Sequence, residues 1–275
     1  MAELVIDNLC VNVKGTPILN GVSLKIKEGE TVALLGPNGH GKSTLLGAIM
    51  GNPNYSVTSG SIYFEGKNVL EMPVSERSKA GLFLGMQYPA EIPGLNSADF
   101  YKAAMNAHRE KPLKVFEFYR LLEKAYEELE IAFEMSKRNL NEGFSGGEKK
   151  RNEILQMRLL SPKICMLDEI DSGLDVDALN IVTDNIKKEQ ERGAGFLVIS
   201  HYAKLFHLIK PTRSAVLVNG RIVYEGGPEV IDRIDKEGYE WLKSELGIEI
   251  EKENPVMASV SIGSCATKVK LDEGK

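Results

Sequence analysis

Residues 36–43 read Gly-Pro-Asn-Gly-His-Gly-Lys-Ser, and this stretch decides how the rest of the chain is interpreted. It follows the apolar run Thr31–Leu35 and precedes apolar residues up to Met50, so we expect a buried strand, a glycine-rich turn and a helix. Glycines let successive backbone N–H groups turn toward one anion, and the helix start adds its positive dipole end. The spacing G-x-x-x-x-G-K-[ST] therefore predicts a phosphate-binding loop.

The residues of this loop have expected roles. Lys42 should bring a positive charge to the β- and γ-phosphates of a nucleotide, and the Ser43 hydroxyl should ligate Mg²⁺. His40 is an unusual residue here, and we expect its side chain to point into solvent and to take no part in catalysis. The expected nucleotide-binding residues of the loop are Gly36, Pro37, Asn38, Gly39, His40, Gly41, Lys42, Ser43 and Thr44.

A second apolar run, Ile164-Cys-Met-Leu-Asp168-Glu169, ends in two carboxylates. Neighbouring residues of a strand face opposite sides, so we expect the two acids to do different work. Asp168 suits Mg²⁺, and Glu169 suits a base that polarises a water molecule in line with the γ-phosphate. Taken alone, the two acids could merely cap the next loop; beside a phosphate loop, the catalytic interpretation is favoured.

A second helix start is expected at Phe144-Ser145-Gly146-Gly147-Glu148. Ser145 and Glu148 have the spacing of a capping box, which by itself explains a helix start. Two consecutive glycines, however, lower helix stability and allow a ligand to approach closely. Bare N–H groups at this start offer a second anion site. One nucleotide does not easily reach both helix starts of one chain if they lie apart, so we expect a site shared between two copies.

Length, charge and cysteine usage exclude several classes of protein. The 275 residues allow one large domain or two small ones. Cys10, Cys165 and Cys265 are too widely spaced for a zinc or disulfide framework, which favours a reducing compartment. The net charge of −5 argues against a nucleic-acid-binding protein. No apolar run of about 18 residues is present, so we expect no membrane insertion.

The remaining pattern predicts one domain over residues 1–250 and an irregular tail at 251–275. Apolar residues alternate with polar ones at 22–26, which favours short strands in the N-terminal part. From about Ala98 to Arg138 apolar residues recur at helical spacing, beginning with Leu113 and Phe116. We therefore expect a helical subdomain inserted at about 90–160 into an α/β fold.

In this order, the motifs resemble the nucleotide-binding domain of the ABC ATPase family, over about residues 3–226. The resemblance implies an α/β P-loop NTPase fold with an N-terminal antiparallel β portion and an inserted helical subdomain. It implies that Gln87 belongs to the Q-loop and that His201 is the switch histidine. Where the family usually has an aromatic residue that stacks on adenine, this chain has Val11 and Val13, so base selectivity should be weak.

The resemblance also implies a set of functional residues and an ATP-dependent, transient homodimer. The implied catalytic residues are Glu169, His201, Lys42 and Gln87. The implied Mg²⁺ ligands are Ser43, Gln87 and Asp168. Ser145, Gly146 and Gly147 resemble the signature motif that meets the nucleotide of the second copy, and Ser172–Asp175 resemble the D-loop.

Residues 141–157, 85–89 and 168–175 closely resemble a narrower branch of that family, the SufC-type ATPases of iron–sulfur cluster assembly. This implies a cytoplasmic enzyme that uses ATP and Mg²⁺ and works with SufB- and SufD-type scaffold proteins, which would dock on the helical insertion and the Gln87 loop. The alternative is the ATPase subunit of a membrane ABC transporter. The basic run Lys149–Arg151 suggests in addition that Lys150 pairs with the Glu169 carboxylate in the resting state.

Overall fold

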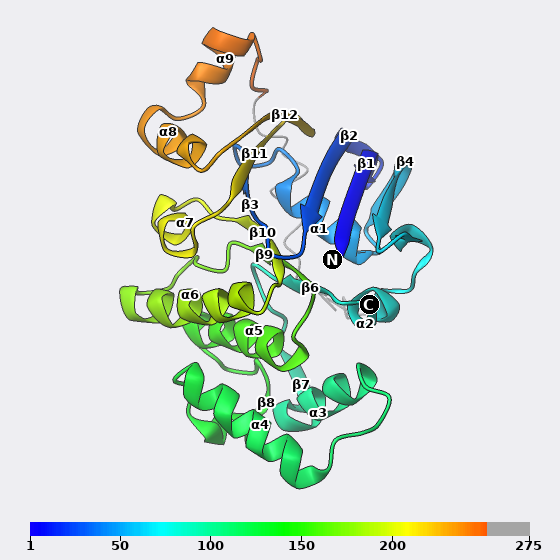
Figure 1. Cartoon of the computed structure of the whole chain (residues 1–275), viewed down its shortest axis with the longest axis vertical. Coiled ribbons are helices and arrows are strands. Elements are labelled where there is room, and N and C mark those ends of the chain that lie inside the picture. Colours follow the sequence, from blue (N-terminus) through cyan, green and yellow to red (C-terminus); the bar gives the residue numbers. More distant parts are fainter. Residues whose placement is uncertain (252–275) are drawn as a thin grey trace, which may run out of the picture.

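A six-stranded sheet forms the centre of the computed structural model, which describes residues 1–251 (Figure 1). All neighbouring strands are parallel except β11 (Arg213–Val218) and β12 (Arg221–Gly226), which form an antiparallel pair at one edge of the sheet. Strands β3, β9 and β10 are buried at every residue, which explains their continuous apolar sequences. In spatial order the strands are β12 (Arg221–Gly226), β11 (Arg213–Val218), β3 (Thr31–Leu35), β10 (Gly195–Ile199), β9 (Ile164–Asp168) and β6 (Leu82–Gly85).

An antiparallel sheet built mostly from the N-terminal part lies beside the central sheet (Figure 1). The expected alternation holds, because Val22, Leu24 and Ile26 are buried while the residues between them are exposed. Val11 and Val13 are fully buried in the core, so neither side chain is available to a nucleotide base. The strands of this sheet are β2 (Thr16–Lys27), β1 (Glu3–Val13), β4 (Tyr55–Phe64) and β5 (Lys67–Asn68), and a separate pair consists of β7 (Ile92–Asn96) and β8 (Asn139–Leu140).

Helices cover both faces of the central sheet. On one face, α1 (Lys42–Met50) packs between the two sheets with side chains such as Val32 and Met166. On the other face, Ala33 and Cys165 pack with apolar side chains of three further helices, so Cys165 is a core residue as expected. These three helices are α5 (Gly146–Leu160), α6 (Val176–Glu191) and α7 (Ala203–Ile209).

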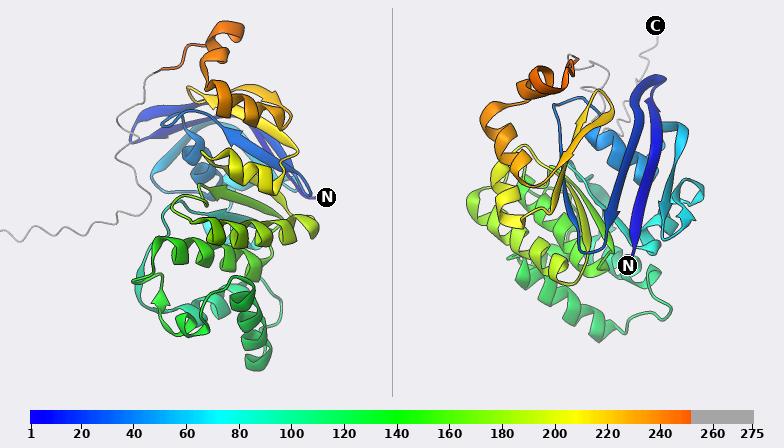
Figure 2. Two further views of the ribbon diagram at one scale, coloured as in Figure 1. Left: turned by 90° about the vertical axis from the view of Figure 1, so that its left-hand side faces the viewer. Right: turned by 45° about the horizontal axis from the view of Figure 1, so that its top comes forward.

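The helices of residues 97–128 lie at one end of the molecule, and α8 and α9 lie at the opposite end (Figure 2). In α4 the buried stripe runs through Phe118 and Leu122, whereas Phe116, expected in the stripe, is 83% exposed. The remaining helices and 3-10 turns are η1 (Val69–Glu71), α2 (Val74–Ala80), α3 (Ser97–Ala107), α4 (Val115–Glu128), η2 (Phe133–Lys137), α8 (Glu229–Glu237) and α9 (Glu240–Leu246). The expected irregular tail lies outside the described residues except for Glu251, and so does Cys265.

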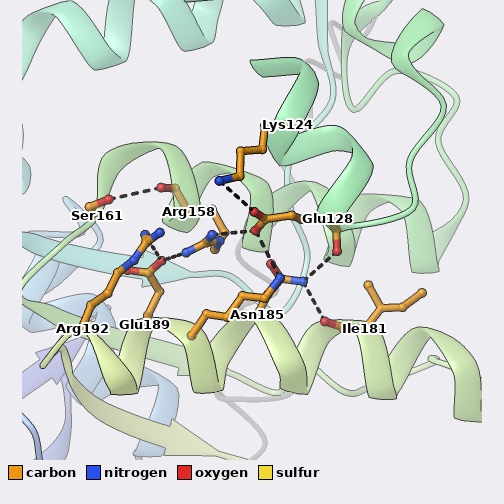
Figure 3. Close-up of polar contacts among 9 residues, drawn as sticks. Lys124, Glu128, Arg158, Ser161, Ile181, Asn185, Glu189 and Arg192 are labelled. Carbon is orange, nitrogen blue, oxygen red and sulfur yellow. Dashed lines mark hydrogen bonds and ion pairs between the residues drawn. The ribbon is translucent and has the colours of Figure 1, made fainter. Parts of the chain in front are cut away.

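A buried ionic cluster ties three of these helices together (Figure 3). Arg158 of α5 contacts Glu189 of α6 and also Glu128 of α4, the latter at 2.6 Å from Nη2 to Oε2. Asn185 of α6 donates to the Glu128 backbone carbonyl at 3.1 Å, and Arg192 contacts Glu189 at 2.8 Å. The end of α4 is therefore fixed to the helices that cover the central sheet.

Arg158→Ala is expected to lower the free energy of unfolding by about 3–5 kcal/mol, because it leaves the Glu189 carboxylate, whose side chain is 2% exposed, without its buried partner. Urea denaturation measures this loss. Arg192→Ala is the matched control: Arg192 contacts the same carboxylate but is 52% exposed, so the loss should stay below about 1 kcal/mol. Equal losses of unfolding free energy in the two variants would show that the buried Arg158 contact stabilises the fold no more than the exposed Arg192 contact.

Candidate functional site

The carboxyl ends of four neighbouring parallel strands, β3, β10, β9 and β6, meet at one edge of the central sheet. The Gly36 loop follows β3, and His201 comes shortly after β10. Glu169 follows β9, and Gln87 comes shortly after β6. In open α/β sheets, ligands bind outside the carboxyl ends of the strands. The topology therefore brings together residues that lie far apart in the sequence.

The Gly36 loop has the curved backbone that a phosphate-binding loop requires. Gly36, Gly39 and Gly41 all have positive φ angles, and a Cβ on Gly36 would lie 2.1 Å from the Leu217 carbonyl oxygen. Lys42 Nζ donates to the carbonyl oxygens of Gly36, at 2.7 Å, and Pro37, at 2.9 Å. No acidic residue occupies the first turn of α1, so its positive dipole end is available to an anion.

Asp168 and Ser43 form a pair of oxygen donors beside this loop. The Ser43 hydroxyl donates to Asp168 Oδ1 at 3.1 Å, and burial raises the pKa of the Asp168 carboxyl to about 6. A divalent cation would further stabilise the ionised form of this buried carboxylate. Mg²⁺ is typically held by one or two carboxylates together with substrate phosphates, so the pair fits that ion. Among residues 1–251, no group of three His, Cys, Asp or Glu side chains is arranged to hold a metal.

Glu169 is held between two other residues of the expected site. Its carboxylate accepts a hydrogen bond from His201 Nε2 at 3.1 Å and one from Gln87 Nε2 at 2.5 Å. The His201 hydrogen bond is the main cause that lowers the pKa of Glu169, and the Gln87 hydrogen bond acts in the same direction. The carboxylate is therefore ionised at neutral pH and can accept a proton. Ligation of Mg²⁺ by Gln87 stays a prediction.

The expected ion pair between Lys150 and the Glu169 carboxylate is wrong. The buried Lys150 ammonium donates instead to three backbone carbonyl oxygens, of Met86 at 3.2 Å, Gln87 at 2.5 Å and Glu169 at 3.0 Å. Glu153, one turn further along α5, accepts from the Met86 N–H at 3.1 Å. Helix α5 therefore holds the backbone of both loops that carry Gln87 and Glu169, and leaves the Glu169 carboxylate to His201 and Gln87.

The expectation that His40 points into solvent is also wrong. His40 is buried, and its Nδ1 accepts from the Asn219 N–H at 2.9 Å. Its carbonyl oxygen accepts from the Gly220 N–H at 3.2 Å. The cause is a tertiary contact: the hairpin turn at Asn219-Gly220, between β11 and β12, lies against the phosphate loop. Tyr239 is a further contact of the loop that the sequence does not reveal, because its hydroxyl accepts from the Gly36 N–H at 2.9 Å.

Asp171 is a second residue whose contact could not be read from the sequence. Its Oδ2 accepts from the buried Ser200 hydroxyl at 2.5 Å. Burial is the main cause that raises the pKa of Asp171. Because Ser200 directly precedes His201, this contact fixes the start of the loop that carries His201.

The helix start at Ser145 is built as expected, but it does not lie beside the phosphate loop of the same chain. Ser145 caps α5 through a complete capping box with Glu148. Helices α1 and α5 pack on opposite faces of the central sheet, so the sheet separates the two helix starts (Figure 1). A Cβ on Gly146 would meet nothing within 4 Å, and one on Gly147 only a Leu174 methyl group at 3.7 Å. Packing within residues 1–251 therefore does not require either glycine.

Comparisons with known proteins agree with this geometry. The family described as ABC transporter matches residues 19–172. Vegetative protein 296 of Bacillus subtilis (strain 168) is 54% identical over 252 residues, which cover 91% of this chain and 97% of that protein. The probable ABC transporter ATP-binding protein spyM18_0273 of Streptococcus pyogenes serotype M18 is 49% identical over 256 residues, 92% of this chain and 100% of that protein.

A solved structure shows the same fold. It is the dimeric post-hydrolysis state of the ATP-binding cassette MJ0796 bound to ADP and Pi, with a TM-score of 0.72 and 22% sequence identity. The match covers 82% of this chain and 98% of that one. Within residues 1–251, no helix combines the length and the apolar character needed to cross a membrane.

Proposed function

Because this chain belongs to the ABC transporter ATP-binding family of ATP hydrolases, we propose that it is a SufC-type ATPase that drives iron–sulfur cluster assembly. In this proposal it hydrolyses ATP at sites shared between two copies, and closure of the pair moves a scaffold of SufB- and SufD-type proteins. The observation that carries the shared site is the separation of the Gly36 and Ser145 helix starts by the central sheet. The MJ0796 cassette, which has the same fold, is dimeric with ADP and Pi bound.

The proposed chemistry assigns one task to each residue of the site. The Gly36 loop and Lys42 bind the phosphates, and Ser43 and Asp168 hold Mg²⁺, which supplies positive charge to the phosphate oxygens. Glu169 takes a proton from the attacking water. His201 and Gln87 orient the Glu169 carboxylate. Ser145, Gly146 and Gly147 contact the nucleotide held by the other copy.

The choice of a cluster-assembly ATPase over a transporter subunit rests on the resemblance of residues 141–157 and 168–175. Transporter ATPases usually have Thr or Pro where this chain has Ile170 and Asp171. Here Ile170 is a fully buried core residue, and Asp171 is bonded to Ser200. The two residues therefore help to hold the loops that carry Glu169 and His201. The name of a similar protein, the probable ABC transporter ATP-binding protein of Streptococcus pyogenes, favours the second candidate, the ATPase subunit of a membrane transporter.

Exposed apolar side chains beside Gln87 support the proposal that a partner protein docks on the Gln87 loop. Met86, Tyr88 and Ile92 are all exposed, and they flank the loop that contacts Glu169. A protein bound there would contact the Gln87 loop directly. We propose that the scaffold docks on these three residues together with the helical insertion at about 90–160, within one domain of residues 1–250.

Tyr88→Glu is expected to reduce co-purification with SufB- and SufD-type proteins by at least about tenfold, because an aromatic anchor at an interface contributes more than about 1.4 kcal/mol. Tyr63→Glu is the matched control: Tyr63 is 42% exposed and Tyr88 is 57% exposed, but Tyr63 lies on the antiparallel sheet. Quantitative pull-down from cells that express all components gives the readout. Recovery of an integral membrane protein instead of the scaffold would favour the transporter subunit.

A further inference from the structure

The phosphate loop is contacted at two points by parts of the chain that follow it by about 200 residues. The Gly36 N–H, at the first residue of the loop, donates to the Tyr239 hydroxyl at 2.9 Å across 203 positions. At the fifth residue, His40 Nδ1 accepts from the Asn219 N–H at 2.9 Å across 179 positions. Gly36 and His40 are both buried, and their partners Tyr239 and Asn219 are half-buried, so each contact is partly shielded from water.

The Asn219 contact is itself fixed by the last residues that the structure describes. Asn219 Nδ2 donates to the Glu249 carbonyl oxygen at 2.7 Å, and Asn219 Oδ1 accepts from the Glu251 N–H at 3.2 Å. The Asn219 backbone thus bonds to the phosphate loop while its side chain bonds to residues 249–251. Helices α8 and α9, which lead to this segment, lie at the same end of the molecule as β11 and β12 (Figure 1).

The glycines of the phosphate loop leave its backbone flexible, so contacts from other parts of the chain can help to fix its shape. Gly36, Gly39 and Gly41 give the backbone more conformational freedom than other residues would, and that freedom must be lost when phosphate binds. Lys42 Nζ holds the loop through the carbonyls of Gly36 and Pro37. The ammonium has three N–H donors and must share them with a phosphate when nucleotide binds, whereas the contacts of Tyr239 and Asn219 involve no group that faces the phosphate.

We propose that Tyr239 and residues 249–251 form a C-terminal clamp that shapes the phosphate loop before nucleotide binds, with Tyr239 as its positioning residue. The inference rests on the proposed nucleotide site at this loop. A loop that is correctly shaped only part of the time binds nucleotide more weakly by that fraction. Once phosphate is bound, the phosphate itself fixes the loop. Loss of the clamp should therefore raise KM and Kd and leave kcat nearly unchanged.

Tyr239→Phe removes only the hydroxyl that accepts from Gly36 and keeps the ring. The loss of one hydrogen bond to a buried N–H should raise the Kd for ATP by about five- to tenfold, with kcat changed less than about twofold. The Kd for ADP should rise by the same factor, because the loop contacts phosphates that both nucleotides carry. Isothermal titration calorimetry of the full chain with ADP and ATP, together with steady-state ATPase assays, measures all three quantities.

Two further variants separate positioning from general stability. Tyr224→Phe is the matched control. Tyr224 packs edge-to-face on Trp241, two residues after Tyr239, at 5.2 Å between ring centroids, and it belongs to β12 rather than to the clamp. Both Kd values should therefore stay as in the unchanged chain. Asn219→Gly keeps the backbone at φ 50, which glycine adopts readily, and removes the bonds to residues 249–251. Like Tyr239→Phe, it should raise the Kd values for both ADP and ATP.

Different results would separate this inference from the proposed function. A Tyr239→Phe chain with lower thermal stability but unchanged Kd for ADP and ATP would give Tyr239 a structural role only and overturn the clamp. A selective loss of ATP affinity, or a fall in kcat at unchanged KM, would also overturn it. If the unchanged chain bound neither ADP nor ATP, the proposed function would fail and the clamp with it.

Discussion

Lys42→Ala should lower the rate of ATP hydrolysis by about 10²–10³-fold, since one group that stabilises charge in a transition state contributes about 3–4 kcal/mol. Lys42 is buried at the start of α1 and bonds to the carbonyls of Gly36 and Pro37, so its ammonium already lies within the phosphate loop. A phosphate-release assay at saturating Mg-ATP gives the rate. The size of the effect follows from removing the single charge at the centre of the loop.

A surface lysine provides the control for this variant. Lys163→Ala removes a lysine whose side chain is 43% exposed and whose partner is Glu65, far from the loop in the sequence. Its effect on hydrolysis should be less than about twofold, as for other exposed ion pairs. Near-normal turnover of Lys42→Ala would rule out the Gly36 loop as the site of hydrolysis.

Glu169→Gln should retain ATP binding and lose hydrolysis by about 10²–10⁴-fold, because the amide keeps the shape of the side chain and cannot take a proton. The hydrogen bond from His201 keeps the native Glu169 ionised, so the contrast between the two side chains is large at neutral pH. With hydrolysis blocked, each ATP remains between the Gly36 loop of one copy and Ser145 of the other. Size-exclusion chromatography with light scattering in Mg-ATP should therefore show a dimer.

A second substitution tests whether Ser145 forms the other half of that site. Glu169→Gln combined with Ser145→Arg should bind ATP and stay monomeric, because the longer, charged side chain fills the open space in front of Gly146 without touching the Gly36 loop. If this double variant dimerised as well as Glu169→Gln alone, the nucleotide would not bridge the two copies. A monomer of Glu169→Gln at saturating Mg-ATP would contradict the shared site altogether.

The features predicted correctly from the sequence are those that depend on neighbouring residues. The apolar runs of β3, β9 and β10, the alternation of β2 and the glycine-rich turn all report local structure, and the α/β P-loop NTPase fold with its antiparallel β portion is confirmed by the family match. Because the strands are parallel and adjacent, the motifs at their ends had to meet. The boundaries of the helical subdomain and the roles of the site residues stay predictions.

The errors concern contacts between segments that are distant in the sequence. His40 is buried because a hairpin 179 positions later lies against it, and nothing in the residues around position 40 signals that hairpin. Lys150 lies near the acidic residues Asp168, Glu169 and Asp171, so an ion pair was expected, but its ammonium donates to three carbonyl oxygens instead. Phe116 has helical spacing from the buried residues, and only the docking of α4 determines that Phe118 is the buried one.

The three carbonyl contacts of Lys150 have a mechanical consequence. Lys150 lies five residues after Ser145 on the same helix, about 7.5 Å along its axis, and a hydrogen-bonded helix transmits a push with little compression. Force applied to the exposed tip of α5 therefore reaches the backbone of Gln87 and Glu169 at once. We therefore expect a second molecule that binds at Ser145 to displace the Gln87 and Glu169 loops as well, because one helix links these three places.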